Sequence, residues 1–458
     1  MSARLDKPNK KCALLTLAFM LISIITACAP AGGNDDVQSA DTLIYANLTE
    51  NGVDRQAVDR FNLTHTDVQI EVRNYFDEDG TSGKDRLFTE IAAGNSPDII
   101  DLGNDSKNSC QLPYQMMVKK GLLENLWPYI ESDPDLGRES VVEAPLKAAE
   151  VDGGLYAAFG SVHINTLVGA ESIVGDRYSW TLDELRDTFS AMPEGSTVLE
   201  FFFQKSDLFH YLFRMSIEDY VNWETGQCTF TGEEFRDALE FINSFPDETS
   251  DLYSDNEEMN REATKRLQQG LQMLSMVDIS RPSDMQILDA YYGQGGHSAL
   301  IGYPVAEGKV GSSFWISGPR LAMSSTCSNR EAAWEFIRGL LLPDYRDTDG
   351  IQKARTVDLP VNRADYELLK QLDVVKGRKG ESVSYSYGTM LKYRKTTVEE
   401  LERFENFVRQ IDRIDLYDNE IYDIAQETVT PYFTGDKTLD ETVALLQNRV
   451  SLYVNEQK

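Results

Sequence analysis

Cys28 has the surroundings of a thiol that reacts covalently with a lipid. It follows Ile25-Thr26-Ala27, a branched apolar residue and two small residues, at the end of an apolar run over residues 12–27. A neck of small residues fits a signal peptidase, and the thiol of the cysteine is a nucleophile. The run itself follows a positively charged start that holds Arg4, Lys7, Lys10 and Lys11. We therefore expect residues 1–27 to be a signal peptide and Cys28 to carry the lipid.

Residues 25–28 resemble the lipobox of bacterial lipoproteins. An ordinary cleaved signal with a chance cysteine, or a single N-terminal anchor helix, is the alternative. The apolar run is shorter than the roughly 20 residues that cross a bilayer comfortably, and no later apolar segment is as long as about 18 residues. Residues 28–41 are small and polar, as in a flexible tether. The chain is thus expected at the extracytoplasmic face of the cell membrane, held there through its lipid anchor only.

The composition excludes several classes of partner. The formal net charge is −31, which repels nucleic acid and anionic lipid surfaces and disfavours a strongly anionic ligand. Three cysteines beyond the lipid site are too few and too widely spaced for a disulfide framework, and the four histidines show no metal-binding spacing. We expect a monomer of two or three domains by length, with no cofactor and no metal.

Catalytic motifs are missing from the sequence. The chain has 75 acidic residues, so carboxylate pairs that could hydrolyse a glycoside arise by chance. It has no Gly-x-Ser-x-Gly, phosphate-loop or His-Glu-x-x-His motif. The acidic segment 77–85 does not match a calcium-binding loop. We expect no catalytic residues, and a secreted glycosidase is a remote alternative.

The N-terminal third predicts a parallel sheet. Strand patterns at 42–48, 68–72 and 98–102 alternate with helix patterns at 54–62 and 86–93. Such a βαβαβ order forms a parallel sheet with right-handed crossovers.

Ligands of such sheets bind outside the carboxyl ends of the strands. This rule points to Asn47 and Glu50 after the first strand, and to Asn104 and Asp105 after the third.

The rest of the chain also contains both strand and helix patterns. Short strand-like runs occur at 198–202, 271–277 and 315–323. Four Thr-x-x-Glu sequences can each form a capping box at the start of a helix. They begin at Thr181, Thr231, Thr397 and Thr438.

Seven short motifs follow one another in the middle of the chain. They are Gly94–Asp101, Lys120–Leu126, Asp152–Tyr156, Trp180–Leu185, Gln269–Met273, Glu331–Phe336 and Leu359–Asn362. In order and spacing they resemble the motifs of sugar-binding, maltose-binding-like (family 1) solute-binding lipoproteins of ABC importers. The sequence departs from the family pattern at Met273, which comes one position early, and at Phe159-Gly160, where a proline is common.

The resemblance implies a two-lobed α/β fold of the periplasmic-binding-protein type. Each lobe would be a mainly parallel sheet flanked by helices, and the lobes would close on ligand by bending at a hinge. Lobe one would comprise 42–155 and 299–355, and lobe two 156–298 and 356–458. The ligand would be a carbohydrate, in particular an oligosaccharide, delivered to ABC permease subunits. A same-fold binder of a peptide or another solute, or a surface sensor, is the alternative.

A neutral sugar offers hydroxyl groups and an apolar ring face. Its site needs aromatic platforms together with carboxylate, amide or guanidinium groups. The resemblance places an acidic contact at Asp105 and a polar contact at His163. Helix capping is the alternative role for Asn104 and Asp105, and an internal structural role is the alternative for His163.

The second lobe supplies further candidate contacts. Three polar residues follow the strand pattern at 271–277 and would face the cleft, namely Asp278, Ser280 and Arg281. Three aromatic residues are candidate stacking platforms, namely Trp223, Phe314 and Trp315. Packing in the core is the alternative role for Trp315, and plugging the surface is the alternative for Trp223.

Overall fold

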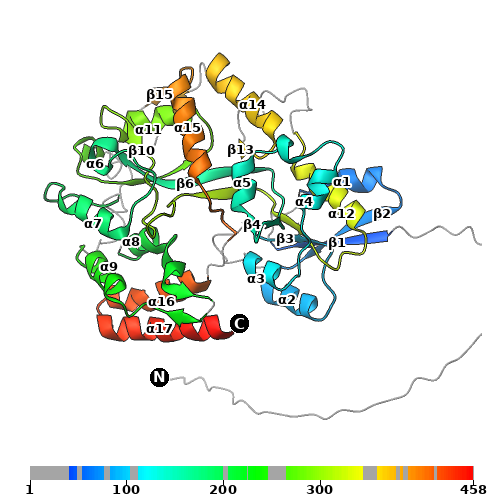
Figure 1. The fold of residues 1–458 in the computed structure, drawn as a ribbon, viewed down its shortest axis with the longest axis horizontal. Coiled ribbons are helices and arrows are strands. Elements are labelled where there is room, and N and C mark those ends of the chain that lie inside the picture. Colours follow the sequence, from blue (N-terminus) through cyan, green and yellow to red (C-terminus); the bar gives the residue numbers. More distant parts are fainter. Residues whose placement is uncertain are drawn as a thin grey trace, which may run out of the picture. The chain divides into compact units, whose positions relative to one another are not determined.

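The computed structural model describes residues 41–48, 54–76, 83–103, 112–199, 205–223, 225–245, 262, 265–343, 358–377, 382–384, 390–416 and 420–456. All of them lie in one compact unit that spans Ala40–Lys458. Its helices and sheets form the two-lobed periplasmic-binding-protein-like fold, with one main sheet in each lobe (Figure 1).

The first sheet has four strands in the order β12-β3-β1-β2. They are β1 (Asp41–Asn47), β2 (Val68–Asn74), β3 (Ile99–Asp101) and β12 (Leu321–Met323). β1 pairs in parallel with β2 and with β3, whereas β12 is antiparallel to β3. The connecting helices are α1 (Arg55–Thr64) and α2 (Lys84–Ala92). The predicted βαβαβ start of the chain is therefore confirmed.

Helix α1 is fixed at its start and along one face. The side chain of Asp54 caps it by accepting a hydrogen bond from the amide of Ala57. Its buried Phe61 meets the edge of Phe336 in α12 (Arg330–Ile337), and Tyr45 of β1 meets the same ring. Figure 1 shows α1 and α12 together beside β1. These aromatic contacts hold the two helices on one face of the first sheet.

Shorter elements complete the first half of the chain. They are α3 (Tyr114–Lys119), α4 (Trp127–Ser132), η1 (Arg138–Ser140), α5 (Glu143–Ala148), β4 (Glu150–Val151) and β5 (Gly154–Leu155). The last two form a small antiparallel hairpin just before the chain passes to the second sheet.

The second sheet is centred on the ten-residue strand β6 (Ser161–Ala170). Its partners are β9 (Ser275–Ile279), β10 (Ser298–Ala299), β11 (Ser313–Ser317) and β13 (Leu359–Pro360), and all four pair with β6 antiparallel. The expectation of a mainly parallel sheet holds for the first sheet and is wrong for the second. The reason is that β6 brings the chain into the second sheet, whereas β11 leads it back to β12 of the first.

The predicted lobe boundaries differ from the sheet pairings at one place. Residues 299–355 were assigned to lobe one, yet β10 and β11 pair with β6. In terms of the sheets, the chain returns to the first one between Ser317 and Leu321. The other boundaries stay a prediction.

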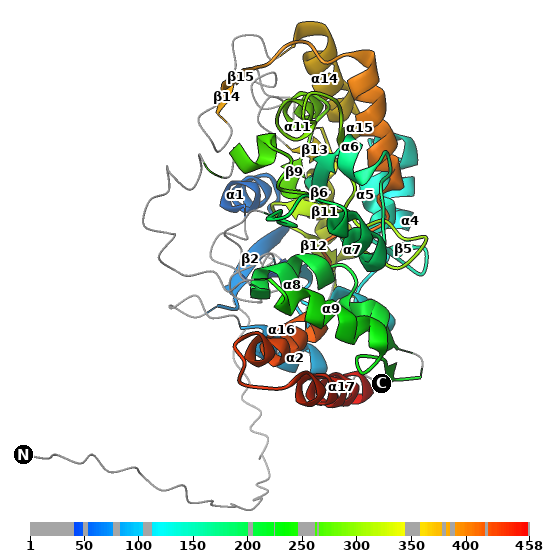
Figure 2. The same cartoon turned by 90° about the vertical axis from the view of Figure 1, so that its left-hand side faces the viewer.

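Helices dominate the remainder of the second lobe. Their bounds are α6 (Glu171–Val174), α7 (Leu182–Ser190), α8 (Lys205–Phe213), η2 (Ile217–Tyr220), α9 (Glu233–Asn243), α11 (Asp284–Tyr292), α14 (Arg363–Gln371), η5 (Leu372–Lys376), α15 (Val398–Gln410), α16 (Glu420–Phe433) and α17 (Leu439–Glu456). Two small hairpins accompany them, formed by β7 (Val221–Asn222) with β8 (Gln227–Cys228) and by β14 (Ser382–Ser384) with β15 (Met390–Lys392). Figure 2 shows α16 and α17 packed with α8 and α9. A short helix of the first lobe, η4 (Arg338–Leu340), directly follows α12.

Three of the four predicted capping boxes form. The hydroxyls of Thr181, Thr397 and Thr438 each accept the amide of the glutamate three residues later. The fourth prediction, at Thr231, is wrong. Helix α9 begins one residue later than predicted, so Gly232 takes the capping position and offers no side chain.

A buried ion pair joins the connection between the sheets to a later segment. Arg320 is fully buried, and its Nη2 lies 2.9 Å from Oδ2 of Asp415. The other carboxylate oxygen of Asp415 accepts from the amide of Ile316 in β11, and the carbonyl of Arg320 accepts from the amide of Leu102. This network fixes β11 relative to the end of β3.

Candidate functional site

The second sheet carries polar side chains on one of its two faces. The sequences Ser-Val-His-Ile-Asn in β6, Val-Asp-Ile in β9 and Ser-Phe-Trp-Ile-Ser in β11 alternate polar with apolar residues. Residues paired across strands point to the same side of a sheet. The register pairs His163 with Trp315 and Asn165 with Asp278, so these four share a face. We give the name polar face to six of the residues on it: His163, Asn165, Asp278, Ser313, Trp315 and Ser317.

The opposite face of these strands is core. Its side chains are all buried, namely Val162, Ile164, Val277, Ile279, Phe314 and Ile316. A shift of one residue in register would turn these apolar side chains outward. Burial of this apolar set therefore fixes the orientation of the polar face.

An amide–carboxylate pair lies at the centre of the polar face. The Tyr303 hydroxyl donates to Oδ1 of Asn165 over 2.5 Å, and Nδ2 of Asn165 donates to Oδ1 of Asp278 over 2.8 Å. The carboxylate of Asp278 is 56% exposed, whereas Asn165 is buried. The chain of bonds holds Asp278 in place while leaving a carboxylate oxygen able to accept from a ligand hydroxyl.

His163 has a partner that determines its tautomer. The Ser317 hydroxyl donates to Oδ2 of Asp358 over 2.5 Å, and Nδ1 of His163 lies 3.2 Å from the same hydroxyl oxygen. Because the Ser317 proton is used by Asp358, this network assigns the imidazole proton to Nδ1. Nε2 is then an acceptor, 3.9 Å from Asp278 and partly exposed.

Trp315 supplies an apolar surface within these polar groups. Its indole is half-buried, and its Nε1 donates to Oγ of Ser313 over 3.2 Å. The His163 ring lies 6.0 Å away, tilted by 44°. The guanidinium carbon of Arg214, the residue just after α8, lies 4.1 Å from the centre of the indole ring. Aromatic, amide, carboxylate and guanidinium groups thus come together here.

Two tyrosines and a histidine extend this cluster into the protein. Tyr211 of α8 stacks with Tyr303 at 6.4 Å and 7°. Burial raises the pKa of Tyr303, so its hydroxyl keeps the proton that it donates to Asn165. Burial, followed by the charge of Arg214, lowers the pKa of His210 to about 4. His210 is therefore neutral at pH 7 and bonds the Tyr422 hydroxyl over 2.6 Å.

Three sequence-predicted contacts, His163, Asp278 and Trp315, are brought together on the polar face. Phe314, the neighbour of Trp315, points the other way and is fully buried. The prediction that Phe314 is a stacking platform for the ligand is therefore wrong. Phe314 packs in the core because successive residues of a strand face opposite sides of the sheet.

Two residues after β9 that were predicted to contact the ligand instead form bonds within the protein, in the loop before α11. Arg281 is buried, and its Nη2 lies 2.5 Å from Oδ1 of Asp373. The amide of Ser280 donates to Oδ2 of Asp284 over 2.8 Å. These bonds shape the turn into the helix.

The remaining predicted contacts lie elsewhere or are not described. Asn47 is buried at the end of β1, where its Nδ2 donates to Oδ1 of Asn74 over 3.0 Å. Trp223 packs edge-on against Tyr453 of α17. The other predictions lie outside the described residues, namely Cys28, Glu50, Asn104 and Asp105.

Sequence reasoning missed three residues of the cluster. Asn165 sits two positions after His163, and this polar alternation was the signal that could have identified it. Arg214 and Tyr303 carry no such signal, because they approach Trp315 and Asn165 from distant parts of the chain.

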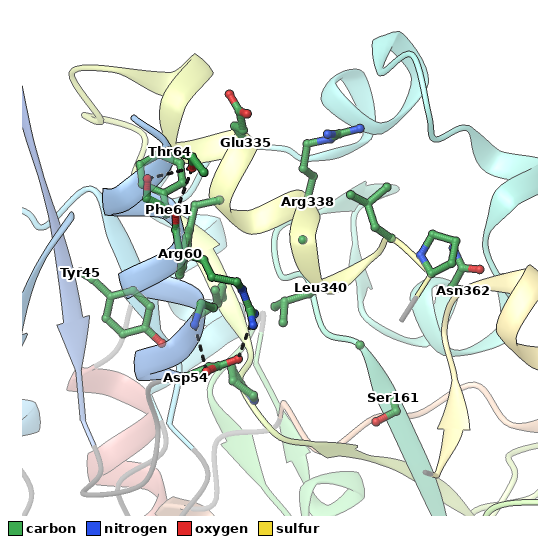
Figure 3. A pocket seen from close by; sticks show the side chains of 18 of the residues that line it. Tyr45, Asp54, Arg60, Phe61, Thr64, Ser161, Glu335, Arg338, Leu340 and Asn362 are labelled. Carbon is green, nitrogen blue, oxygen red and sulfur yellow. Dashed lines mark hydrogen bonds and ion pairs between the residues drawn. The ribbon is translucent and has the colours of Figure 1, made fainter. Parts of the chain in front are cut away.

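A cavity of about 570 Å³ lies along α1 and reaches the second sheet at Ser161, which pairs in register with Ser317 of the polar face. Figure 3 shows its labelled side chains, which come from β1, α1, α12 and η4 on one side and from β6 and the residue before α14 on the other. Its charged groups have partners: Asp54 with Arg60 at 3.9 Å, and His65 with Glu335 at 3.3 Å. None of the six polar-face residues lines it. We therefore place the candidate site at the polar face, where chemically diverse groups converge.

Metal and membrane features were also sought. Within the described ranges, no cluster of histidine, cysteine, aspartate and glutamate side chains could hold a metal ion. No helix in the same ranges has the length and apolarity needed to cross a membrane.

Comparison with known proteins identifies the fold but no sequence relative. No protein-family model matches the chain, and no curated protein matches it either. Among solved structures, the chain is similar to the sugar-binding protein MalE from Xanthomonas citri. The TM-score is 0.51 at 15% identity, over 91% of this chain and 98% of that one.

A second similar structure is a putative oligosaccharide periplasmic-binding protein from Synechococcus sp. MITs9220. The TM-score is 0.50 at 14% identity, over 90% of this chain and 99% of that one. Both matches cover nearly the whole of the other chain, so the two-lobed fold is shared from end to end. At such low identity the likeness concerns the fold alone.

Proposed function

We propose that this chain is the solute-binding component of an ABC importer and captures a carbohydrate, in particular an oligosaccharide, at the polar face. The observation that carries the proposal is Trp315, a half-buried indole that lies beside His163 and shares its sheet face with Asn165 and Asp278. A sugar ring packs its apolar face on an aromatic ring, and its hydroxyls bond carboxylate, amide and imidazole groups. The shared fold supports the proposal by analogy.

The proposed mechanism involves binding and no covalent chemistry on the ligand. Ligand contacts made by both lobes favour a closed form over an open one, and the closed form docks on permease subunits. We propose lobe boundaries as predicted from the sequence, except that residues 299–317 belong with the second sheet.

The location follows from the N-terminus. Cleavage after residue 27 and lipid on Cys28 would hold a monomer at the extracytoplasmic face of the membrane. The predicted tether 28–41 is one residue too long, because Asp41 is the first residue of β1, so we propose residues 28–40 as the tether. Intact-mass measurement of the membrane-extracted protein tests this proposal. The mass of a lipidated cysteine is expected in the wild type and lost in Cys28→Ala.

Thermal unfolding with a panel of sugars, peptides and polyols tests the binding role. A ligand that binds only the folded state stabilises it by about 2.7 kcal/mol at a hundred times its Kd, so a cognate sugar raises Tm. Trp315→Ala is expected to abolish the shift. The matched control is Trp223→Ala, which removes an indole that packs on α17 and should keep the shift. A Tm rise with peptides alone would favour the same-fold peptide binder.

A further inference from the structure

Arg214 lies where a ligand on the polar face would meet a positive charge. Its guanidinium carbon is 4.1 Å from the centre of the Trp315 ring, which is a stacking distance. A guanidinium stacked on an indole keeps its N–H groups at the edge of its plane, where they can donate, and the guanidinium of Arg214 also bonds the Tyr303 hydroxyl. The side chain is half-buried, so this edge is only partly hydrated.

The environment of Arg214 differs from that of three other arginines among the described residues. Arg320, Arg281 and Arg403 each have a carboxylate oxygen within 2.9 Å, from Asp415, Asp373 and Asp289 respectively. No carboxylate among the described residues forms an ion pair with Arg214. In a chain with 75 acidic residues and a net charge of −31, a half-buried guanidinium without such a partner is unexpected.

The neighbours of Arg214 compensate its charge only in part. The end of α8 contributes a partial negative charge, as every helix C-terminus does. His210, one turn earlier, is neutral because burial and Arg214 lower its pKa to about 4. The nearby Tyr303 is also neutral, because burial raises its pKa. Asp278, the exposed carboxylate of the polar face, is bonded to Asn165 instead.

We infer that the ligand is an acidic sugar, a uronate, whose carboxylate pairs with Arg214 while its hydroxyls bond Asp278 and His163. This inference rests on the proposed function and specifies its substrate class. Carboxylate oxygens match the guanidinium fork in a bidentate way that a sugar hydroxyl does not.

The net charge of the chain does not oppose this assignment. Repulsion by distant acidic groups is screened beyond a Debye length of about 8 Å at physiological ionic strength. A single carboxylate per sugar is one charge, and the groups that contact it determine its binding. The net charge of −31 repels a polyanion such as nucleic acid more strongly than it repels a short oligouronate, which carries fewer charges.

The test is a calorimetric titration of the whole protein with matched ligands. Short oligogalacturonates and oligoglucuronates are compared with galactose and glucose oligomers of the same linkage, in which a primary hydroxyl replaces the carboxylate. Charge-assisted hydrogen bonds predict that at least one uronate binds roughly 10- to 100-fold more tightly than its neutral counterpart. Arg214→Gln should bring this ratio close to one, and Arg214→Lys should keep part of it. Arg409→Gln removes an exposed charge on α15 and should leave the ratio unchanged.

The outcomes separate the two proposals. Neutral sugars that bind the wild type as tightly as uronates, or an acid preference that persists in a folded Arg214→Gln, would overturn the uronate assignment and leave sugar capture standing. Failure of every sugar, acidic and neutral, with a Tm shift from another solute class, would overturn the proposed function and this inference with it.

Discussion

The first and second sheets differ in how their faces are covered. In β3 and β12 of the first sheet, consecutive residues are all buried, as in strands that are covered on both faces. In β9 and β11 of the second sheet, buried and accessible residues alternate, as in antiparallel sheets with one open face. A sheet covered on both sides can present side chains to a ligand only at its strand ends. A sheet with one open face can present them along its strands.

This difference explains where the candidate contacts lie. The rule of strand ends selected Asn47, which the structure buries and bonds to Asn74. The same rule does not include Asn165, because this residue lies in the middle of β6, where it contacts Asp278 across the sheet. Coverage of the two faces of a sheet therefore determines which of its positions can contact a ligand.

The largest expected change in stability comes from a comparison of the two faces of β11. Phe314 is fully buried, and truncation to alanine should lower the free energy of unfolding by about 3–5 kcal/mol. Trp315 is half-buried on the polar face, so Trp315→Ala should lower it by less, about 1–2 kcal/mol, and weaken sugar binding at least tenfold. Urea unfolding and calorimetry measure the two quantities. Equal destabilisation with unchanged affinity for Trp315→Ala would place this indole in the core.

Much of the fold could be predicted from local patterns. The strands near 42–48 and 68–72 and the helix between them follow from periodicity, because burial of one face imposes it. The capping box at Thr181 follows from residue types alone. Thr231 shows the limit of such signals: the glycine after it takes the cap, and nothing local distinguishes the two positions.

The candidate site could be predicted only in part. His163, Asp278 and Trp315 were found because order and spacing along the chain resemble a known pattern. Their association depends on antiparallel register between segments more than a hundred residues apart. Arg214 and Tyr303 join the cluster through tertiary packing of α8 and of the loop after β10, which leaves no trace in local sequence.

A second prediction contrasts the titration of one buried group in each lobe. In the first sheet, burial raises the pKa of Asp101 from 3.8 to about 6. The folded state then binds the proton more tightly, so this contribution to stability is present below pH 3.8 and is lost as pH rises through 6. In the second lobe, burial and Arg214 lower the pKa of His210 from 6.5 to about 4. The unfolded state binds that proton more tightly, so stability is full above pH 6.5 and falls as pH drops toward 4.

The two contributions, each on the order of 3 kcal/mol, have opposite slopes and largely cancel in the wild type. Urea unfolding between about pH 4 and 7 separates them. Relative to the wild type, Asp101→Asn should lose more stability on acidification, because only the His210 contribution remains. His210→Gln should lose less. Parallel pH profiles for all three proteins would contradict the burial of both groups.

The smallest expected effect comes from a comparison of two asparagines, one in each main sheet, that donate a hydrogen bond to their register partner. Asn47 pairs in register with Asn74 in the first sheet, and Asn165 with Asp278 in the second, and each donates its amide hydrogen to that partner. Loss of a buried hydrogen bond should cost about 1–2 kcal/mol of stability in both alanine variants. Only Asn165→Ala should also weaken sugar binding, since its partner is the exposed carboxylate of the polar face. A loss of affinity in a folded Asn47→Ala would show instead that the end of β1 contacts the ligand, and that the covered first sheet shares the site with the open second one.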